Sequence, residues 1–238
     1  MRSNSGGGAV RRAKVIIANG EKGGVAKSLL SIVLCHITQP PLVVVDFDVS
    51  NHDVYDACDF VDDGDKYKLD ISKEAAWDTL ADIIEGSPGH TVIVNLPAQS
   101  DAAFQTNGVP LLTAGIDADF FTIWALGPFR DSTKQLQKYL QLGTGEPVHV
   151  ARAMFQVDDE SDFEYFNNTL HSLDLRGGLV FDHIRAAFRT RALIFEGDEA
   201  TDRRYSIKSI LDNGPKITAQ RTRRYVDAMR PALEKVLG

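Results

Sequence analysis

From residue 13 onward the chain alternates between short apolar runs and longer amphipathic stretches. The apolar runs are nearly continuous in Val, Ile and Phe, a pattern typical of central parallel strands that are covered on both faces. Strands are predicted at Lys14–Ala18, Leu42–Phe47, Thr91–Asn95, Phe120–Trp124, Val148–Phe155 and Leu179–Phe181.

The stretches between these runs predict helices. They are expected at Lys27–Thr38, Ser72–Glu85, Asp101–Thr113, Phe129–Gln141, Ser161–His171 and Ile217–Val236, the last one interrupted by Pro231. Regular alternation of strand and helix indicates an α/β fold with a mostly parallel, twisted sheet and helices on both faces. A chain of 238 residues suits one such domain, predicted at 13–238, behind a flexible Ser/Gly-rich tail at 1–12.

Charge is distributed unevenly along the chain, whose net charge is −7. Residues 1–175 hold 13 Lys and Arg against 25 Asp and Glu, whereas residues 176–238 hold 13 against 8. The basic C-terminal part suits an interaction surface, and a solvated helix face explains the same excess. No apolar run approaches the roughly 18 residues that a membrane span needs, and no signal-peptide core is present. We therefore expect a protein of the bacterial cytoplasm, with Cys35 and Cys58 reduced.

The segment NGEKGGVAKS, Asn19–Ser28, lies between the first predicted strand and an apolar helix. It approaches the phosphate-loop pattern G-x-x-x-x-G-K-[ST], with Glu21 and Ala26 at the two glycine positions. In such a loop the backbone N–H groups and the N-terminus of the next helix bind a phosphate. Lys27 is expected to reach the β- and γ-phosphates, and the Ser28 hydroxyl to bind Mg²⁺.

A second lysine, Lys22, makes the resemblance more specific. The stretch EKGGVAKS resembles the deviant Walker A motif K-G-G-x-G-K-[ST] of the ParA/MinD group of ATPases at every position except Ala26. The resemblance implies ATP and Mg²⁺ as ligands. It also implies an ATP-dependent homodimer, in which Lys22 crosses the interface and acts catalytically, as an arginine finger does, on the partner's nucleotide. Gly23 and Gly24 leave the backbone room to approach a phosphate, and Val25 can point into the core. The implied nucleotide-binding residues are Glu21, Lys22, Gly23, Gly24, Val25, Ala26, Lys27 and Ser28.

Two aspartates follow the second predicted strand in LVVVDFDVSNHD, which resembles the switch I segment of the same group. The resemblance places Asp46 near the magnesium and gives Asp48 the task of orienting or deprotonating the attacking water. Carboxylates at the C-terminal edge of a parallel sheet lie where ligands bind. The alternative is that the two aspartates cap a turn at the end of the strand.

The stretch HTVIVNLPAQS resembles a Walker B strand in which Asn95 replaces the usual aspartate. An amide supplies no negative charge, so the site formed by Ser28, Asp46 and Asn95 is expected to hold Mg²⁺ less firmly and hydrolysis to be slow. The Cβ of Ala26 is also expected to slow hydrolysis, because it crowds the loop. Asn95→Asp is then expected to tighten Mg²⁺ binding and to raise hydrolysis. Asparagine at this position in a single domain also resembles the StbB and TraL type of ParA-like proteins from plasmid stabilisation and conjugation operons.

The basic C-terminal part offers Arg221, Arg223 and Arg224 to DNA phosphates, and the resemblance implies non-specific DNA binding there. Alternatively, this segment is a terminal helix that packs an apolar stripe on the sheet and turns its arginines to solvent. That stripe consists of Tyr225, Met229, Leu233 and Val236. A membrane-surface helix is a third interpretation, disfavoured by Pro231. Base recognition is poorly defined, with Gln156 as the residue nearest to the family's adenine-binding position.

Three functions remain open at this point. The first is an ATP-dependent dimerising switch of the ParA/MinD type that acts in plasmid DNA segregation, stabilisation or conjugative transfer. Its partners would be a plasmid-encoded adaptor or DNA-binding protein, and its ATP hydrolysis would be weak. The second is a hydrolysis-deficient, nucleotide-binding scaffold. The third, a small-molecule kinase, is disfavoured because the sequence shows no arginine-rich lid.

Overall fold

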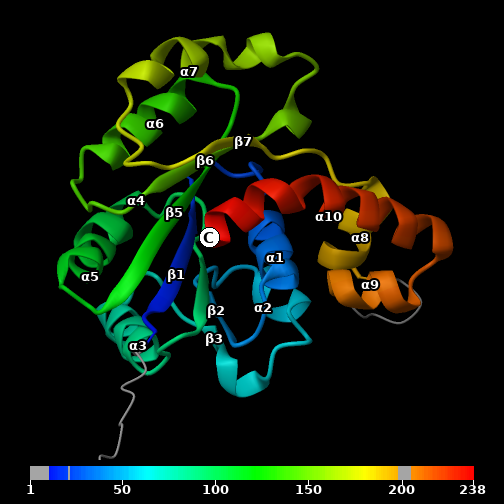
Figure 1. The fold of residues 1–238 in the computed structure, drawn as a ribbon, viewed down its shortest axis with the longest axis horizontal. Helices are drawn as coiled ribbons and strands as arrows, with labels where there is room; N and C mark the ends of the chain where they lie inside the picture. The colour runs from blue at the N-terminus through cyan, green and yellow to red at the C-terminus, as the bar shows by residue number, and fades with distance from the viewer. Residues whose placement is uncertain (1–10, 21, 198–204) are drawn as a thin grey trace, which may run out of the picture.

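Seven parallel strands form one sheet in the computed structural model, which describes residues 11–20, 22–197 and 205–238 (Figure 1). The strands are β1 (Ala13–Asn19), β2 (Leu42–Asp46), β3 (Lys66–Lys68), β4 (Thr91–Asn95), β5 (Ala118–Leu126), β6 (Val148–Arg152) and β7 (Val180–Asp182). Their order across the sheet is β3-β2-β4-β1-β5-β6-β7. The predicted parallel α/β fold is confirmed, and the predicted tail lies outside the described residues apart from Arg11 and Arg12.

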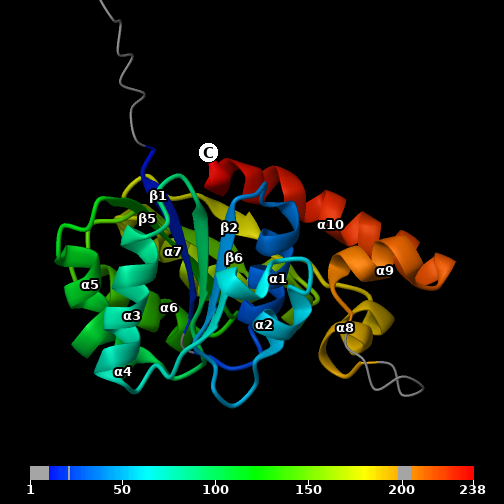
Figure 2. The same cartoon turned by 90° about the horizontal axis from the view of Figure 1, so that it is seen from below.

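Helices cover both faces of this sheet (Figures 1 and 2). One face carries α1 (Lys27–Ile37), α2 (Asp53–Ala57), α8 (Phe188–Phe195), α9 (Ile207–Asn213) and α10 (Lys216–Leu237). The other carries α3 (Glu74–Glu85), α4 (Asp101–Ala103), α5 (Val109–Thr113), α6 (Arg130–Leu140) and α7 (Glu164–Thr169), with a π-helical turn at Phe104–Gly108. Short 3-10 turns lie at Asp63–Asp65, Met154–Gln156, Glu160–Phe163 and Leu170–Ser172.

The central strands are apolar on both sides because each side meets a helical layer. In β1, Ile16 belongs to the core under α1, whereas Val15 and Ile17 belong to the core under α3. All three are at most 1% exposed. Successive side chains of a strand point to opposite faces, so a strand buried on both faces reads as a continuous apolar run. This is why the inner strands could be predicted from the sequence.

The predicted interruption of the last helix at Pro231 is wrong. Helix α10 runs unbroken from Lys216 to Leu237 with Pro231 inside it. Proline removes one backbone donor, which leaves the carbonyl of Asp227, four residues earlier, without its helical partner. Both residues are exposed, so water can satisfy that carbonyl and the helix continues.

The apolar stripe of α10 packs into the core. Tyr225, Met229, Leu233 and Val236 are all at most 3% exposed. The side chain of Lys14 in β1 donates a hydrogen bond to the carbonyl of Leu237, which fixes the end of the helix to the sheet. The face that a membrane-surface helix would need is therefore buried. Within the described ranges, no helix combines the length and the apolar character that crossing a bilayer requires.

Candidate functional site

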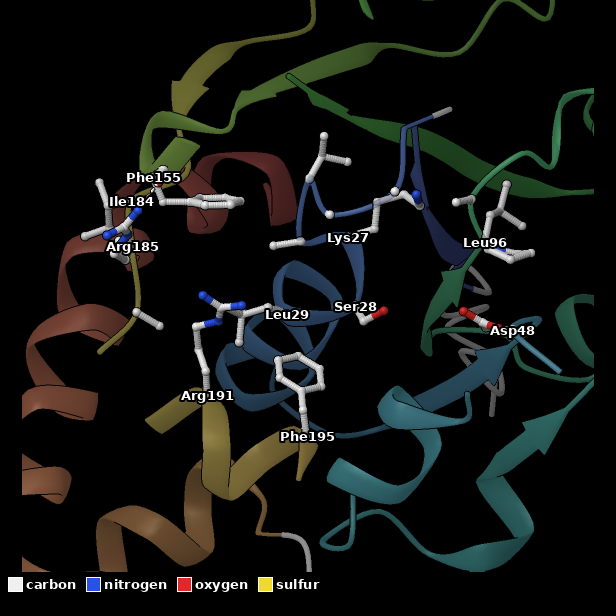
Figure 3. Close-up of a pocket in the computed structure, with 17 residues that line it drawn as sticks. Lys27, Ser28, Leu29, Asp48, Leu96, Phe155, Ile184, Arg185, Arg191 and Phe195 are labelled. Atoms are coloured by element: carbon white, nitrogen blue, oxygen red, sulfur yellow. Dashed lines mark hydrogen bonds between the residues drawn. The ribbon is translucent and has the colours of Figure 1, made fainter. Parts of the chain in front are cut away.

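A cavity of about 300 Å³ opens at the C-terminal edge of the sheet (Figure 3). Its walls come from the loops that follow β1, β2, β4, β6 and β7, together with the start of α1 and helix α8. The lining residues are Gly23, Gly24, Val25, Ala26, Lys27, Ser28, Leu29, Asp48, Leu96, Pro97, Ala98, Phe155, Ile184, Arg185, Ala186, Arg191 and Phe195. Ligands of open parallel sheets bind at this edge, so the cavity is the candidate site.

The loop between β1 and α1 forms the central wall of the cavity. Gly24 has a φ of +77°, a left-handed conformation that glycine adopts without steric cost. Val25 is 2% exposed and packs into the core, as the sequence predicts. Lys27 is 7% exposed, and its Nζ donates to the carbonyl of Lys22 at 3.3 Å. Glu21 lies outside the described residues.

Gln156 supports this loop from the segment after β6. Its Nε2 donates to the carbonyl of Gly24 at 3.0 Å. The contact ties two segments that are far apart in the sequence, so Gln156 positions the loop backbone. The cavity wall at this point is formed by the neighbouring Phe155.

Ala26 departs from the phosphate-loop pattern in a position with a left-handed backbone. Its φ of 59° and ψ of 39° lie at the N-terminus of α1. A residue with a Cβ pays about 1–2 kcal/mol for this conformation, whereas glycine does not. The cost of Ala26 therefore lies in its own backbone conformation, in addition to any crowding of the loop.

Ala26→Gly is expected to stabilise the protein by about 0.5–1 kcal/mol, because relief of the left-handed strain exceeds the extra chain entropy of glycine. Urea unfolding followed by circular dichroism measures the difference. The matched control is Ala228→Gly at an exposed position within α10, which is expected to destabilise by about 1 kcal/mol. Destabilisation by both changes would show that Ala26 is not strained.

Asp46 is a fully buried carboxylate at the end of β2. Its Oδ1 accepts hydrogen bonds from the Asn95 side chain at 2.9 Å and from the backbone of Asp48 at 3.2 Å. Its Oδ2 accepts from the backbone N–H groups of Val54 and Tyr55, at 3.1 and 3.2 Å. Burial raises the pKa of Asp46, and the hydrogen bonds, led by that from Asn95, act against the rise. These bonds fix the start of α2 to the end of β2.

Asn95 connects three elements behind the cavity. It is 1% exposed at the end of β4. Its Nδ2 donates to Asp46, while its Oδ1 accepts from the hydroxyl of Ser31 in α1 at 3.2 Å. An amide can donate and accept at once, which an ionised carboxylate cannot do. The geometry thus gives asparagine a specific use at this position, which the comparison of motifs alone did not suggest.

Asp48 and Ser28 stand at the cavity wall. The Oδ1 atom of Asp48 accepts from the backbone of Ser50 at 3.1 Å and of Asn51 at 3.2 Å, so this aspartate does cap a turn. Its carboxylate also borders the cavity, as does Ser28. Both interpretations of Asp48 from the sequence are therefore compatible with its position.

Oxygen donors at the cavity match Mg²⁺ in chemistry but are few. In the part of the chain that the structure describes, no group of three or more His, Cys, Asp or Glu side chains is arranged to hold a metal. Mg²⁺ commonly takes one or two protein oxygens and completes its shell with substrate phosphates and water. The donor set of Ser28 and Asp48 fits a magnesium ion that enters with a nucleotide.

Helix α8 and the segment after β7 form a wall that the sequence did not reveal. Arg191 and Phe195 of α8 reach the cavity, as does Arg185 after β7 (Figure 3). In the sequence, Arg185 and Arg191 belong to the basic part at residues 176–238, which suits an interaction surface. Only the fold brings these arginines to the same cavity as the loop after β1, because the two segments are more than 150 residues apart.

The candidate DNA-binding residues lie on the outer side of α10. Arg221, Arg223 and Arg224 are all exposed. Arg221 and Arg224 border a second, open hollow together with Phe188, which is 80% exposed. The arrangement presents positive charge beside an aromatic ring, close to the α8 wall of the cavity.

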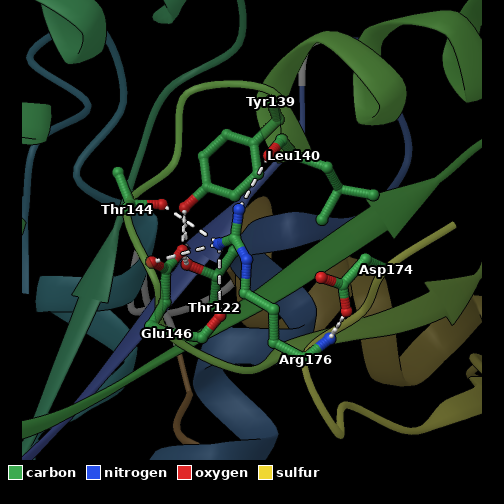
Figure 4. Close-up of polar contacts among 7 residues, drawn as sticks. All are labelled: Thr122, Tyr139, Leu140, Thr144, Glu146, Asp174 and Arg176. Atoms are coloured by element: carbon green, nitrogen blue, oxygen red, sulfur yellow. Dashed lines mark hydrogen bonds and ion pairs between the residues drawn. The ribbon is translucent and has the colours of Figure 1, made fainter.

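A further cluster of buried ionisable groups holds α6 against β5 (Figure 4). Oε1 of Glu146 accepts hydrogen bonds from Tyr139 at 2.7 Å and from Thr122 at 3.2 Å, and Arg176 lies 3.6 Å from Oε2. Burial, followed by the charge of Glu146, raises the pKa of Tyr139. Arg176 also donates to the carbonyl of Leu140 at the end of α6, at 2.7 Å. These contacts join backbone elements, so the cluster has a structural role.

No family model and no curated protein matches the sequence. Among solved structures, the chain is similar to a plasmid partition protein from Borrelia burgdorferi, with 13% identity and a TM-score of 0.53. That alignment covers 95% of this chain and 99% of the other. A protein assigned to plasmid partition in Borrelia burgdorferi B31, solved with bound AMPPNP, aligns with 14% identity and a TM-score of 0.46 over 71% of this chain and 86% of its own. The first similarity shows that the two chains share a fold.

Proposed function

We propose that this chain is a nucleotide-dependent switch of the ParA/MinD type, which binds ATP with Mg²⁺ and acts in plasmid DNA segregation, stabilisation or conjugative transfer. The observation that carries the proposal is the position of Lys27 and Ser28 at the N-terminus of α1, directly after the loop that follows β1, at a cavity on the C-terminal edge of the sheet. The fold shared with a plasmid partition protein supports the choice of process.

In this proposal, the backbone of residues 22–28 and the Lys27 ammonium bind the phosphates. Ser28 ligates the magnesium ion, which neutralises charge on the phosphates. Asp46 and Asn95 are buried and hydrogen-bonded to each other, so they would act on the metal through water molecules. Asp48, at the cavity wall, is the residue placed to orient the attacking water.

Homodimer formation is the second part of the proposal. Lys22, in the loop after β1, is exposed, so its side chain is available to a second subunit. Phe129, after β5, is 65% exposed and Val49, after β2, is 53% exposed. Both follow strand ends at the edge that holds the cavity, and exposed apolar groups of this kind suit a partner surface.

Lys22→Ala is expected to leave ATP binding by the monomer within about threefold of wild type, because Lys27 supplies the charge inside the same loop. The ATP-dependent dimer is expected to be lost, because Lys22 would reach the partner's phosphates. Light scattering with and without ATP measures this difference. An unchanged dimer in the variant would remove the deviant lysine, and with it the ParA/MinD assignment, from the proposal.

DNA is the proposed partner of the exposed arginines on α10. Contacts from Arg221, Arg223 and Arg224 to phosphates would be independent of sequence and sensitive to salt. A plasmid-encoded adaptor or DNA-binding protein would act at the same or a neighbouring surface. Phosphate release measured with and without DNA tests this link, because a switch responds to its partner.

A hydrolysis-deficient scaffold is the second candidate function. The geometry of Asp46 favours it, since four donors from Asn95, Asp48, Val54 and Tyr55 occupy this carboxylate. A carboxylate held in this way has little freedom to serve the metal. ATP binding without phosphate release, in the presence or absence of DNA, would support the scaffold. Release that DNA stimulates would support the switch.

A further inference from the structure

Arg191 is held at the cavity by a helix whose position is fixed by the core. Helix α8 contacts α2 and α10. Its Leu193 and Ile194 are at most 3% exposed. The hydroxyl of Thr190 is 2.8 Å from that of Thr222 in α10, and both threonines are fully buried. These contacts anchor the buried side of α8, so the side that carries Arg191 faces the cavity in a defined position.

The charges around the cavity suit a polyphosphate. The cationic side chains that line it are Lys27, Arg185 and Arg191, and Asp48 is the acidic one among the described residues. Arg185 donates to the carbonyl of Phe155 at 2.6 Å, which ties its guanidinium to the loop after β6. Figure 3 shows Arg191 extending from α8 into the space between Phe155 and Leu29. Its guanidinium therefore points toward the volume that a ligand would fill.

The order of residues along the cavity indicates which part of a nucleotide Arg191 would meet. In Figure 3, Asp48 and Leu96 lie at one end, Ser28 in the middle, and Arg191 with Phe155 at the other end. A residue that orients water for hydrolysis must stand beside the terminal phosphate, which places that phosphate at the Asp48 end. The nucleoside then lies at the opposite end, next to the aromatic ring of Phe155.

We propose that Arg191 is a phosphate-binding residue that contacts the phosphate nearest the nucleoside, from the wall opposite the phosphate loop. The inference rests on the proposed function, since it assumes that a nucleotide occupies the cavity. A guanidinium presents paired donors that match phosphate oxygens, and such charge-assisted bonds are among the stronger polar contacts. Arg191 would thus clamp the nucleotide between α8 and α1.

The test is titration of wild type and variants with ATP and with ADP by isothermal calorimetry. Arg191→Ala is expected to weaken ATP and ADP by about tenfold each, because both ligands carry the phosphate in question. Arg191→Lys is expected to recover part of the loss. The control is Arg189→Ala, an exposed arginine on the same helix, which is expected to bind both nucleotides as wild type does.

The possible results of these titrations distinguish the role of Arg191 from nucleotide binding itself. Equal affinity of wild type and Arg191→Ala for both nucleotides would overturn the role of Arg191 while the proposed function stands. A loss for ATP alone would overturn the assignment to the phosphate nearest the nucleoside. Absence of binding by wild type would overturn the proposed function itself. Thermal unfolding of every variant checks that a loss of affinity is not a loss of fold.

Discussion

Lys27→Ala is expected to lower the affinity for ATP by at least about a hundredfold. In the proposed phosphate loop, Lys27 is the cation that faces the phosphates, and because it is 7% exposed its ammonium would act in a partly desolvated site where a charge-assisted contact is strong. The other lysine of this loop, Lys22, is exposed and does not line the cavity, so it cannot replace Lys27. Isothermal calorimetry of wild type and variant with Mg²⁺ and ATP measures the change.

Two controls accompany this prediction. Lys22→Ala removes a lysine five residues earlier and is expected to retain monomer affinity, which separates the specific role of Lys27 from the loss of any positive charge. Thermal unfolding shows whether the variant is folded. Undiminished affinity in a folded Lys27→Ala protein would mean that residues 22–28 do not form a phosphate loop.

Asn95→Asp is expected to destabilise the protein by about 3 kcal/mol at pH 8, which is the second large effect. The new carboxylate would take the place of the Nδ2 donor that now lies 2.9 Å from Oδ1 of Asp46, and both side chains are at most 1% exposed. Two buried like charges at this distance cost several kcal/mol, so the pair is expected to bind a shared proton.

The pH dependence follows from that proton. The pair has a raised pKa in the folded state, so the variant loses stability as the pH rises above the ordinary carboxyl value and regains it at lower pH. Urea unfolding at pH 5 and pH 8 is expected to show the larger loss at pH 8. Ser31→Ala removes the other hydrogen bond of Asn95 and is expected to cost about 1 kcal/mol at both pH values.

This result would differ from the expectation based on motifs, under which Asn95→Asp gains magnesium affinity and hydrolysis. Because Asn95 donates to Asp46, the structure instead predicts proton uptake and a weaker fold. A variant as stable as wild type at pH 8, with faster phosphate release, would contradict the structural account of Asn95. It would also restore the interpretation of position 95 as a Walker B position that lacks its charge.

The sequence predicted most accurately those strands and helices whose pattern lies in consecutive residues. Strand β4 has the predicted bounds Thr91–Asn95, because its apolar run is buried on both faces. Edge strand β3, with the sequence KYK, was missed because two lysines flank a single tyrosine at a half-exposed edge. Helices α8 and α9 were missed because they are short and lie among basic residues.

The candidate site likewise has a part that could be predicted from the sequence and a part that could not. The loop at 19–28 could be found because its chemistry lies in ten consecutive residues. The position of Arg191 and the contact of Gln156 with this loop could not be predicted, because only the fold brings α8 and the segment after β6 to the same edge of the sheet as the loop. The hydrogen bond between Asn95 and Asp46 likewise joins the ends of two neighbouring strands, β4 and β2. Register between strands is a property of the fold and is not written in a local motif.

A crystal structure of this chain with Mg²⁺ and a non-hydrolysable ATP analogue would decide whether the cavity is a nucleotide site. We expect the phosphates to lie on the backbone of residues 22–28 with Lys27 and Ser28 in contact. The terminal phosphate is expected to lie toward Asp48, and Arg191 to lie beside the phosphate next to the ribose. An analogue bound elsewhere on the protein, or a cavity that remains empty at saturating concentration, would contradict the proposed nucleotide site.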